Sequence, residues 1–322
     1  MTNPADVSGS WPSSVAVVGA GTMGIGVSHV FALAGVPTVL IDATAARAEE
    51  ARTRSLQLVA ALAEAGTVDR GAPGRVGQFT SAAASVEAGV AEADLIVEAV
   101  VERADVKHDV YETIEAAADA SSVIATNTSS IPIALLASRL TAPGRFLGVH
   151  WFVPPLLVPC VEVIPAPATD EQVVTDVVAM LTELDKAPVV VGDGPGFVAN
   201  RIQFAMFKEA AKIVVEGLAT PEQVDEVVRS SFGFRLPFFG PFTIADMAGL
   251  DVYADIFDTL ERGLGPDFSA PELLTAHVAN GEFGVKSGRG FLDITTDEAA
   301  ALIDRRDRAY LALARLRREL DG

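Results

Sequence analysis

Two side chains in the middle of the chain have the chemistry of an acid–base pair. His150 ends an apolar segment, residues 146–150, and histidine exchanges protons near neutral pH. Glu162 lies in a second apolar segment, residues 160–164, where an unpaired carboxylate would be costly to bury. His150 alone could equally be a core histidine, but a contact with Glu162 would satisfy both groups. We therefore predict that Glu162 orients the imidazole and raises its basicity, leaving the other ring nitrogen for proton transfer.

A glycine-rich segment near the N-terminus has the spacing of a dinucleotide-binding loop. A strand-like segment, residues 15–18, runs into a GxGxxG pattern that opens a helical segment. The first glycine permits a tight turn, the second lets backbone N–H groups approach a pyrophosphate, and the third allows close helix–strand packing. The helix N-terminus adds a partial positive charge without any lysine. The residues of this loop are Gly19, Ala20, Gly21, Thr22, Met23 and Gly24.

An acidic residue follows this loop at the sequence spacing that dinucleotide-binding sites have. Asp42 comes directly after a second apolar segment, residues 37–41, and lies 18 positions beyond Gly24. An acid at this place accepts hydrogen bonds from the adenosine ribose and repels a 2′-phosphate. The combination favours an NAD site over a glycine-rich structural turn, and NAD over NADP.

The elements that must position these residues alternate through the first 190 residues. Short segments rich in Val and Ile are separated by helix-length segments, which is typical of a parallel sheet covered by helices. The predicted strands, buried on both faces, are residues 15–18, 37–41, 94–97, 122–125, 146–149 and 188–191, with 161–164 as a further strand that can be antiparallel. The predicted helices include residues 21–34, 45–65, 104–118 and 131–138. The predicted fold class is α/β, a Rossmann-type, doubly wound and mainly parallel sheet.

The pattern changes at a Gly/Pro cluster, residues 192–196. Helical segments follow it, at residues 197–216, from the N-cap Thr220 to residue 231, and at the terminal amphipathic stretch 298–320. We predict an NAD-binding Rossmann domain over residues 1–192, with residues 1–12 disordered. An all-helical C-terminal domain is predicted over residues 193–322, and the family resemblance described below implies that it serves substrate binding and dimerisation.

The composition excludes several classes of protein. The chain has 43 Asp and Glu against 24 Lys and Arg, a net charge of −19, and such a surface repels nucleic acid and anionic lipid. Cys160 is the sole cysteine, so a disulfide framework or cysteine metal cluster is excluded; we expect it to be a small buried hydrophobe. No apolar run reaches the roughly 20 residues of a membrane helix, and the N-terminus has no secretory signal. We expect a cytoplasmic protein without a metal.

The other three histidines have no predicted chemistry. His29 lies in the helix after the glycine loop, where we expect it to pack. His108 and His277 lie in charged or mixed helical segments, and we expect both at the surface.

The ordered motifs together resemble the 3-hydroxyacyl-CoA dehydrogenase family over essentially the whole chain, in particular its 3-hydroxybutyryl-CoA dehydrogenases. Beyond the glycine loop, His150 and Glu162, the matches are Glu98-Ala-Val-Val-Glu102 with Lys107, Asn127-Thr-Ser-Ser130, Gly194-Pro-Gly-Phe-Val-Ala-Asn200-Arg201 and Phe283-Gly-Val-Lys286-Ser-Gly-Arg-Gly290. The resemblance implies that His150 is the catalytic base with Glu162 as its partner. It implies that Ser129 and Asn200 hydrogen-bond the substrate. It also implies that Glu102, Lys107 and Asn127 lie at the nicotinamide half of NAD, and that the protein is a homodimer.

Three departures from the family bear on the substrate. Val153 stands where the family usually has asparagine, either by drift or because the pocket is altered. The predicted hairpin, residues 45–78, has no lysine, although the phosphates of CoA favour basic groups. The segment from Gly233 to Pro241 is long and resembles the gulonate and carnitine dehydrogenases, which act on small free acids. Within it, Arg235 is a candidate partner for a substrate carboxylate, or an ordinary surface arginine.

Three functions remain open on the sequence alone. The first is NAD-dependent interconversion of an L-3-hydroxyacyl thioester, on CoA or a carrier protein, and its 3-oxoacyl form. The second is the same chemistry on a small free hydroxy acid. The third is a non-catalytic NAD-binding protein, against which the presence of Ser129, His150, Glu162 and Asn200 argues.

The assignment of Asp42 predicts the cofactor preference. Because its carboxylate would repel a 2′-phosphate, catalytic efficiency should be higher with NADH than with NADPH. Steady-state rates with each cofactor measure this, and equal efficiencies would refute the role given to Asp42.

Overall fold

The computed structural model describes residues 11–321. The disorder predicted for residues 1–12 therefore falls mainly on residues 1–10, which lie outside this range, whereas Trp11 packs against the core. The chain divides into two compact units, Met1–Met206 and Phe207–Gly322. We describe each unit by itself.

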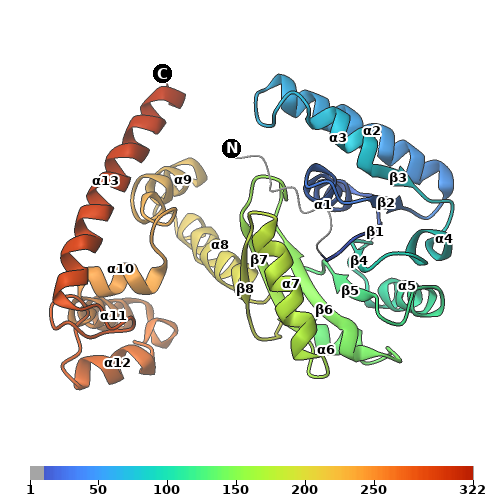
Figure 1. Ribbon diagram of the computed structural model, residues 1–322. Coiled ribbons are helices and arrows are strands. Elements are labelled where there is room, and N and C mark those ends of the chain that lie inside the picture. The colour runs from blue at the N-terminus through green and yellow to red at the C-terminus, as the bar shows by residue number, and fades with distance from the viewer. Residues whose placement is uncertain (1–10, 322) are drawn as a thin grey trace. The chain divides into compact units, whose positions relative to one another are not determined.

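An eight-stranded sheet forms the centre of the first unit (Figure 1). The strand order is β3-β2-β1-β4-β5-β6-β7-β8; neighbouring strands are parallel except for β6 and β7, which are antiparallel. This order confirms the predicted Rossmann-type sheet, with the predicted antiparallel strand as β7. The strands are β1 (Val15–Val18), β2 (Thr38–Ile41), β3 (Thr80–Ala82), β4 (Leu95–Glu98), β5 (Val123–Thr126), β6 (Phe146–Trp151), β7 (Cys160–Pro165) and β8 (Ala187–Val190).

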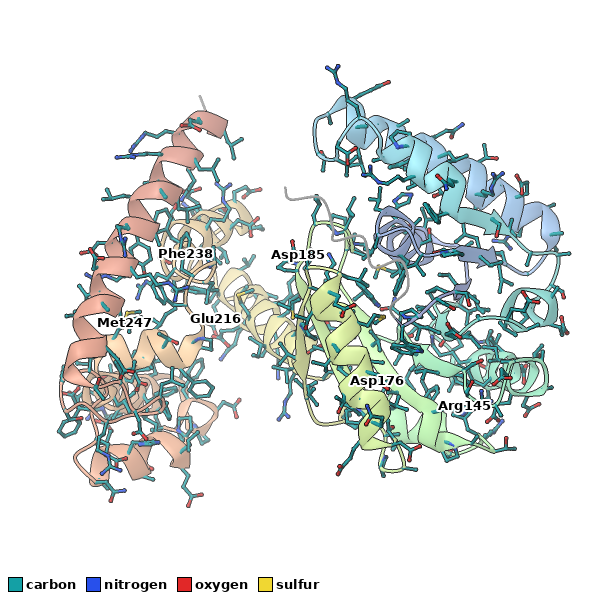
Figure 2. The ribbon with its side chains drawn as sticks, viewed as in Figure 1. Arg145, Asp176, Asp185, Glu216, Phe238 and Met247 are labelled. Atoms are coloured by element: carbon teal, nitrogen blue, oxygen red, sulfur yellow. The ribbon has the colours of Figure 1, made fainter. Side chains whose placement is uncertain are left out.

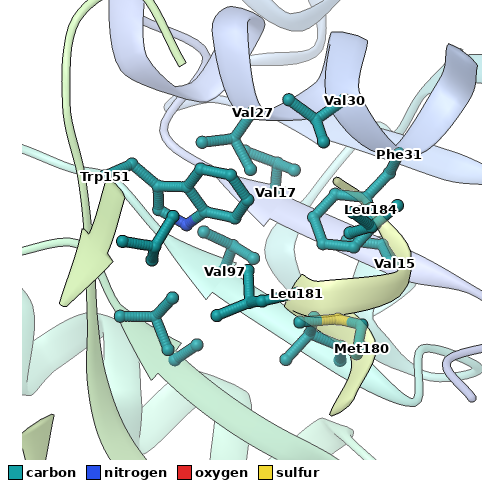
Figure 3. Close-up of a cluster of buried hydrophobic side chains, with 14 of the residues drawn as sticks. Val15, Val17, Val27, Val30, Phe31, Val97, Trp151, Met180, Leu181 and Leu184 are labelled. Carbon is teal, nitrogen blue, oxygen red and sulfur yellow. The ribbon is translucent and has the colours of Figure 1, made fainter. Parts of the chain in front are cut away.

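Alternate side chains of each strand enter two different cores, because successive residues of a strand point to opposite faces. On one face, Val15 and Val17 pack with α1 and α7; on the other, Ala16 and Val18 pack with α4, α5 and α6. Figure 3 shows Trp151 in the first core beside α1, where its ring meets Phe31 edge-on at 6.3 Å. The helices are α1 (Thr22–Leu33), α4 (Val86–Val90), α5 (Ala104–Ala117), α6 (Ile133–Ala137) and α7 (Glu171–Glu183).

A helical hairpin covers the outer side of α1. It consists of α2 (Ala45–Glu64) and α3 (Ala72–Phe79), which share a small apolar cluster with α1. His29 of α1 is buried as expected, with its Nε2 2.8 Å from the hydroxyl of Ser55 on α2. Burial also lowers the pKa of His29, although the backbone of Ser55 partly opposes this.

Three expectations about burial are wrong. His108 is buried rather than exposed, because α5 turns it toward α6 and its Nε2 lies 3.3 Å from the carbonyl oxygen of Leu135. Val189 and Val190 are about half exposed (47% and 52%), since β8 is the edge strand of the sheet. Cys160, at the first position of β7, is only partly buried.

The second unit is built from helices around a small core of its own. Ala245, Leu250 and Leu274 form the buried centre. Thr220 caps α9 and forms a capping box with Gln223, as its place before a proline predicts. The helices after α8 (Ala199–Val215) are α9 (Pro221–Ser230), α10 (Pro241–Ala248), α11 (Leu250–Leu264), α12 (Glu272–Ala279) and α13 (Thr296–Asp321), with short 3-10 turns η2 (Phe232–Phe234) and η3 (Pro266–Phe268). The predicted helical C-terminal domain is confirmed.

Glycine at position 24 is required by a close contact. A Cβ atom there would lie 2.0 Å from the carbonyl oxygen of Gly19, which is backbone and cannot move aside. Gly24→Ala should therefore destabilise the protein by about 1–3 kcal/mol, as overpacking does. Urea unfolding followed by circular dichroism measures this.

A matched control is Gly74→Ala in α3, where an added Cβ meets nothing within 4 Å. This variant should be neutral or slightly stabilising. Equal unfolding midpoints for the two variants would contradict the packing argument.

Candidate active site

The glycine loop presents backbone N–H groups to an open space. Gly19 has a φ of 102° and lies so close to Ala99 that a Cβ would sit 2.5 Å from its carbonyl carbon. At Gly21, by contrast, an added Cβ would meet nothing within 4 Å, and no side chain caps the start of α1. An uncapped helix N-terminus with free space in front of it fits a pyrophosphate. Thr22 is exposed beside this space, whereas Met23 packs partly against the core.

Asp42 is held at the end of β2 beside this loop. Its carboxylate accepts hydrogen bonds from the backbone N–H groups of Ala20 (3.2 Å) and Ala43 (2.8 Å), and Arg47 lies 3.3 Å away. Arg54 of α2 donates to the carbonyl oxygen of Ala20 at 2.9 Å. Arg54 was not predicted as part of the site, because no local pattern connects a helical arginine with a loop 34 residues earlier.

Glu98, which the sequence reasoning did not assign to the site, is the most enclosed carboxylate near it. It ends β4, is fully buried, and accepts four hydrogen bonds, so its charge is satisfied. The donors are the backbone of Val100, the ammonium of Lys107 and the hydroxyls of Tyr111 and Thr126, each at 2.7 Å. Burial, together with the negative charge of Glu98, raises the pKa of Tyr111 well above its usual value. An acid in an apolar strand was the signal that could have identified it.

Lys107 connects Glu98 with Glu102. The Lys107 side chain has no exposed surface, and its ammonium lies 3.5 Å from the carboxylate of Glu102. Glu102 accepts hydrogen bonds from the hydroxyl of Thr128 (2.7 Å) and the backbone of Ser129 (2.8 Å). Burial would raise the pKa of Glu102, but these bonds and the charge of Lys107 outweigh it and lower the pKa. Glu102 therefore holds the turn that carries Ser129; the contacts of both charged residues with NAD stay predictions.

His150 and Glu162 are cross-strand neighbours on β6 and β7. Nδ1 of His150 lies 2.8 Å from Oε2 of Glu162, and their side chains are only 5% and 3% exposed. The other carboxylate oxygen accepts hydrogen bonds from the backbone N–H groups of Val198 (3.1 Å) and Ala199 (2.9 Å) where α8 begins. A helix N-terminus favours a negative charge at this place.

The first turn of α8 also reaches the Ser129 turn. Nδ2 of Asn200 donates to the carbonyl oxygen of Ser129 at 2.8 Å. Asn127, after β5, accepts a hydrogen bond from the backbone of Trp151 at 2.9 Å and so fixes the residue that follows His150. These residues belong to the first unit and gather where its parallel strands end, the edge at which such sheets bind ligands.

Arg235, the predicted substrate ligand, belongs to the second unit, between η2 and α10, and is half-buried. His277 in the same unit is partly exposed, with its Nδ1 2.7 Å from the carboxylate of Glu282.

Two features are not found among the residues that the structure describes. Within residues 11–321, no three His, Cys, Asp or Glu side chains are grouped so that they could hold a metal ion. Over the same range, no helix has both the length and the apolar composition needed to cross a bilayer.

The sheet order, glycine loop and acidic residue after β2 define a dinucleotide-binding protein, and comparison with known proteins extends this. Residues 14–194 match the NAD binding domain of 3-hydroxyacyl-CoA dehydrogenase, and residues 196–294 match its C-terminal domain. The chain belongs to the 3-hydroxyacyl-CoA dehydrogenase family. It is therefore an oxidoreductase that acts on a CH–OH group with NAD as cofactor.

Three relatives illustrate the range of the similarity. The chain is 33% identical to 5-formyl-3-hydroxy-2-methylpyridine 4-carboxylate 5-dehydrogenase of Mesorhizobium japonicum, over 94% of this chain and 97% of that protein. It is 36% identical to the "Probable 3-hydroxybutyryl-CoA dehydrogenase" of Bacillus subtilis, over 87% and 96%. The crystal structure of a 3-hydroxyacyl-CoA dehydrogenase from Archaeoglobus fulgidus matches with a TM-score of 0.79 at 30% identity, over 94% and 98%.

The buried pair of Lys107 and Glu98 predicts a large effect on stability. Lys107→Met would leave Glu98 buried without its cation, and breaking such a pair from one side destabilises proteins by about 3–5 kcal/mol. Urea unfolding at pH 7 measures the loss. The exposed Lys208 of α8 offers a control, since Lys208→Met should change stability by less than about 0.5 kcal/mol. Similar values for both variants would contradict this account of the network.

Proposed function

We propose that the protein interconverts an L-3-hydroxyacyl thioester, carried by short-chain CoA or a carrier protein, and the corresponding 3-oxoacyl form. The observation that carries this proposal is the buried contact of 2.8 Å between His150 and Glu162 in an NAD-binding fold. Membership of the family supports the thioester as substrate.

His150 acts as the base in the oxidising direction. A carboxylate that accepts from Nδ1–H keeps the proton on that nitrogen, so Nε2 has the lone pair that removes the hydroxyl proton of the substrate. As that proton leaves, the hydrogen on the same carbon departs as hydride, and the hydroxyl becomes a carbonyl. Bound NAD⁺ supplies the hydride acceptor. Glu162, whose other oxygen accepts hydrogen bonds from the N–H groups of Val198 and Ala199, stabilises the imidazolium that forms.

Ser129 and Asn200 orient the substrate. The exposed hydroxyl of Ser129 donates to the substrate oxygen at the reacting carbon. An asparagine amide has two N–H groups, and one of those of Asn200 bonds the Ser129 carbonyl oxygen. We assign the second to the thioester carbonyl, which it polarises.

The cofactor would lie along the carboxyl ends of the strands. The backbone of Gly19, Gly21 and Gly24 and the start of α1 would hold the pyrophosphate, with Thr22 and Met23 beside it. Asp42 would accept from the adenosine ribose. Glu102, Lys107 and Asn127 would serve the nicotinamide half, with Lys107 acting through Glu102 because its own side chain is fully buried.

The wider organisation is also a proposal. Residues 1–192 would bind NAD, and residues 193–322 would bind substrate and join two copies in a cytoplasmic homodimer. The exposed apolar side chains of α8 support such an interface; among them are Ile202, Phe204 and Phe207, each more than half exposed.

A second candidate is the same reaction on a small free hydroxy acid. The arginines of the α2–α3 hairpin are mostly engaged within the protein, which leaves little charge for the phosphates of CoA. Arg47 pairs with Asp42, Arg52 with Glu49, Arg75 with Asp69, and Arg54 bonds the glycine loop. The Mesorhizobium relative is named for a substrate that is itself a carboxylate.

Steady-state kinetics with acetoacetyl-CoA and NADH test the leading proposal. We expect NADH oxidation, with kcat falling by about 10²–10⁴-fold in His150→Ala because the base is lost. Glu162→Gln should also lower kcat, since a neutral amide stabilises the imidazolium less well. His277→Ala, a histidine of the second unit, is the matched control and should retain activity.

Three outcomes would contradict these assignments. Turnover of a free 3-hydroxy acid without any turnover of the thioester would favour the second candidate. Undiminished activity of His150→Ala would refute the base. A folded, NAD-binding protein that turns over neither substrate would have the non-catalytic role.

A further inference from the structure

The C-terminal helix lies beyond the residues that match the family's C-terminal domain model. The matched C-terminal domain covers residues 196–294, and α13 (Thr296–Asp321) follows it. The helix is packed onto the second unit through aromatic contacts. Tyr310 meets the ring of Phe234 edge-on at 5.6 Å, and the guanidinium of Arg317 lies 5.9 Å from the centre of the same ring. The Mesorhizobium relative aligns over 304 residues, 94% of this chain, so its match extends into α13.

An open hollow of about 330 Å³ lies between α13 and α10. This volume is at the lower end of the range in which proteins bind small molecules. Its apolar wall comes from Ile244 and Met247 of α10, the latter labelled in Figure 2. Its polar groups come from the loop before α10 and from α13: Arg235, Arg306, Asp307 and Tyr310.

The charges that line the hollow do not cancel. Arg306 and Asp307 pair with each other at 2.8 Å. Arg235, which is half-buried, makes no ion pair or side-chain hydrogen bond with any side chain that the structure describes, namely those of residues 11–295 and 298–320. A guanidinium stays charged at every physiological pH, so one positive charge in the hollow is uncompensated. The net charge of the whole chain is −19, so the positive charge of Arg235 is opposite in sign to the net charge of the protein.

We propose that this hollow binds a small monocarboxylic acid, with its carboxylate on Arg235 and its apolar body against Ile244 and Met247. A guanidinium forms two parallel hydrogen bonds with a carboxylate, which fixes the orientation of the acid. Tyr310 belongs to the same lining. One uncompensated charge matches one carboxylate, whereas the phosphates of CoA would need several.

The acid can have two sources. It can be the free hydroxy acid of the second candidate function, in which case this inference rests on that function. It can instead be an acid that binds without being turned over. Since binding is measured without turnover, failure of the proposed hydride transfer and failure of this site are separate results.

Isothermal titration of the full-length protein with sodium benzoate tests the site, with benzamide as the neutral analogue. We expect benzoate to bind and benzamide to bind at least about tenfold more weakly, because only benzoate compensates the charge. Arg235→Gln should weaken benzoate binding by a similar factor. Met247→Trp, which fills the apolar side, should weaken it while keeping the arginine. Arg315→Gln, which removes an exposed charge from the same helix, is the matched control and should bind as the unmodified protein does.

A competition arm distinguishes the two sources. If a turned-over hydroxy acid displaces benzoate, and inhibition by benzoate is competitive and lost in Arg235→Gln, the hollow holds the substrate. If benzoate binds equally with and without that acid, the hollow is a separate acid site. Any one of three results would overturn the proposal. These are equal affinity for benzoate and benzamide, equal benzoate affinity of Arg235→Gln and the unmodified protein, and no benzoate binding at all.

Discussion

A carboxylate that is taken out of water must find donors inside the protein, and this requirement links the parts of the catalytic edge. Glu162 is almost completely buried, and its two oxygens face different elements: one contacts His150 on β6, the other the first N–H groups of α8. Leaving such a charge unpaired would cost several kcal/mol. The two strands and the start of α8 must therefore be in place together. Asn200 on α8 also donates a hydrogen bond to the carbonyl oxygen of Ser129. The turn after β5, which carries Ser129, must therefore be in place together with α8.

Glu98, at the end of β4, is a second buried carboxylate that finds its donors inside the protein. Its donors include the fully buried ammonium of Lys107. The same ammonium lies 3.5 Å from the carboxylate of Glu102 and attracts its negative charge. Glu102 in turn holds the Ser129 turn through the hydroxyl of Thr128 and two backbone N–H groups. Two buried carboxylates are thus connected to the turn that carries Ser129 by separate routes, one through Lys107 and Glu102 and one through the start of α8. Satisfied charges at the strand ends thus hold this turn in position.

The strongly acidic composition is compatible with a dinucleotide because the anion is met by backbone dipoles rather than by lysines. Basic side chains are scarce and mostly engaged: Arg54 supports the glycine loop, Lys107 is buried, and Arg47 pairs with Asp42. Arg235 differs because none of the described side chains forms an ion pair or a hydrogen bond with its guanidinium. The chain has a net charge of −19, so its overall electrostatic field repels anions. One unpaired, half-buried cation beside apolar surface is a local feature that would attract a small anion against that field.

The sequence by itself determined the sheet, the glycine loop and the pairing partner of His150. Each follows from a local rule: alternation of apolar strands and helices, the need for glycine at a tight approach, and the cost of an acid in an apolar strand. The same last rule, applied to Glu98, would have found it as well. Only the tertiary structure decided that His108 is buried, that Val189 and Val190 of β8 are about half exposed, and that α13 lines a hollow together with Arg235. Those outcomes depend on which faces of distant elements meet, and a local pattern contains no information about the neighbour that will cover it.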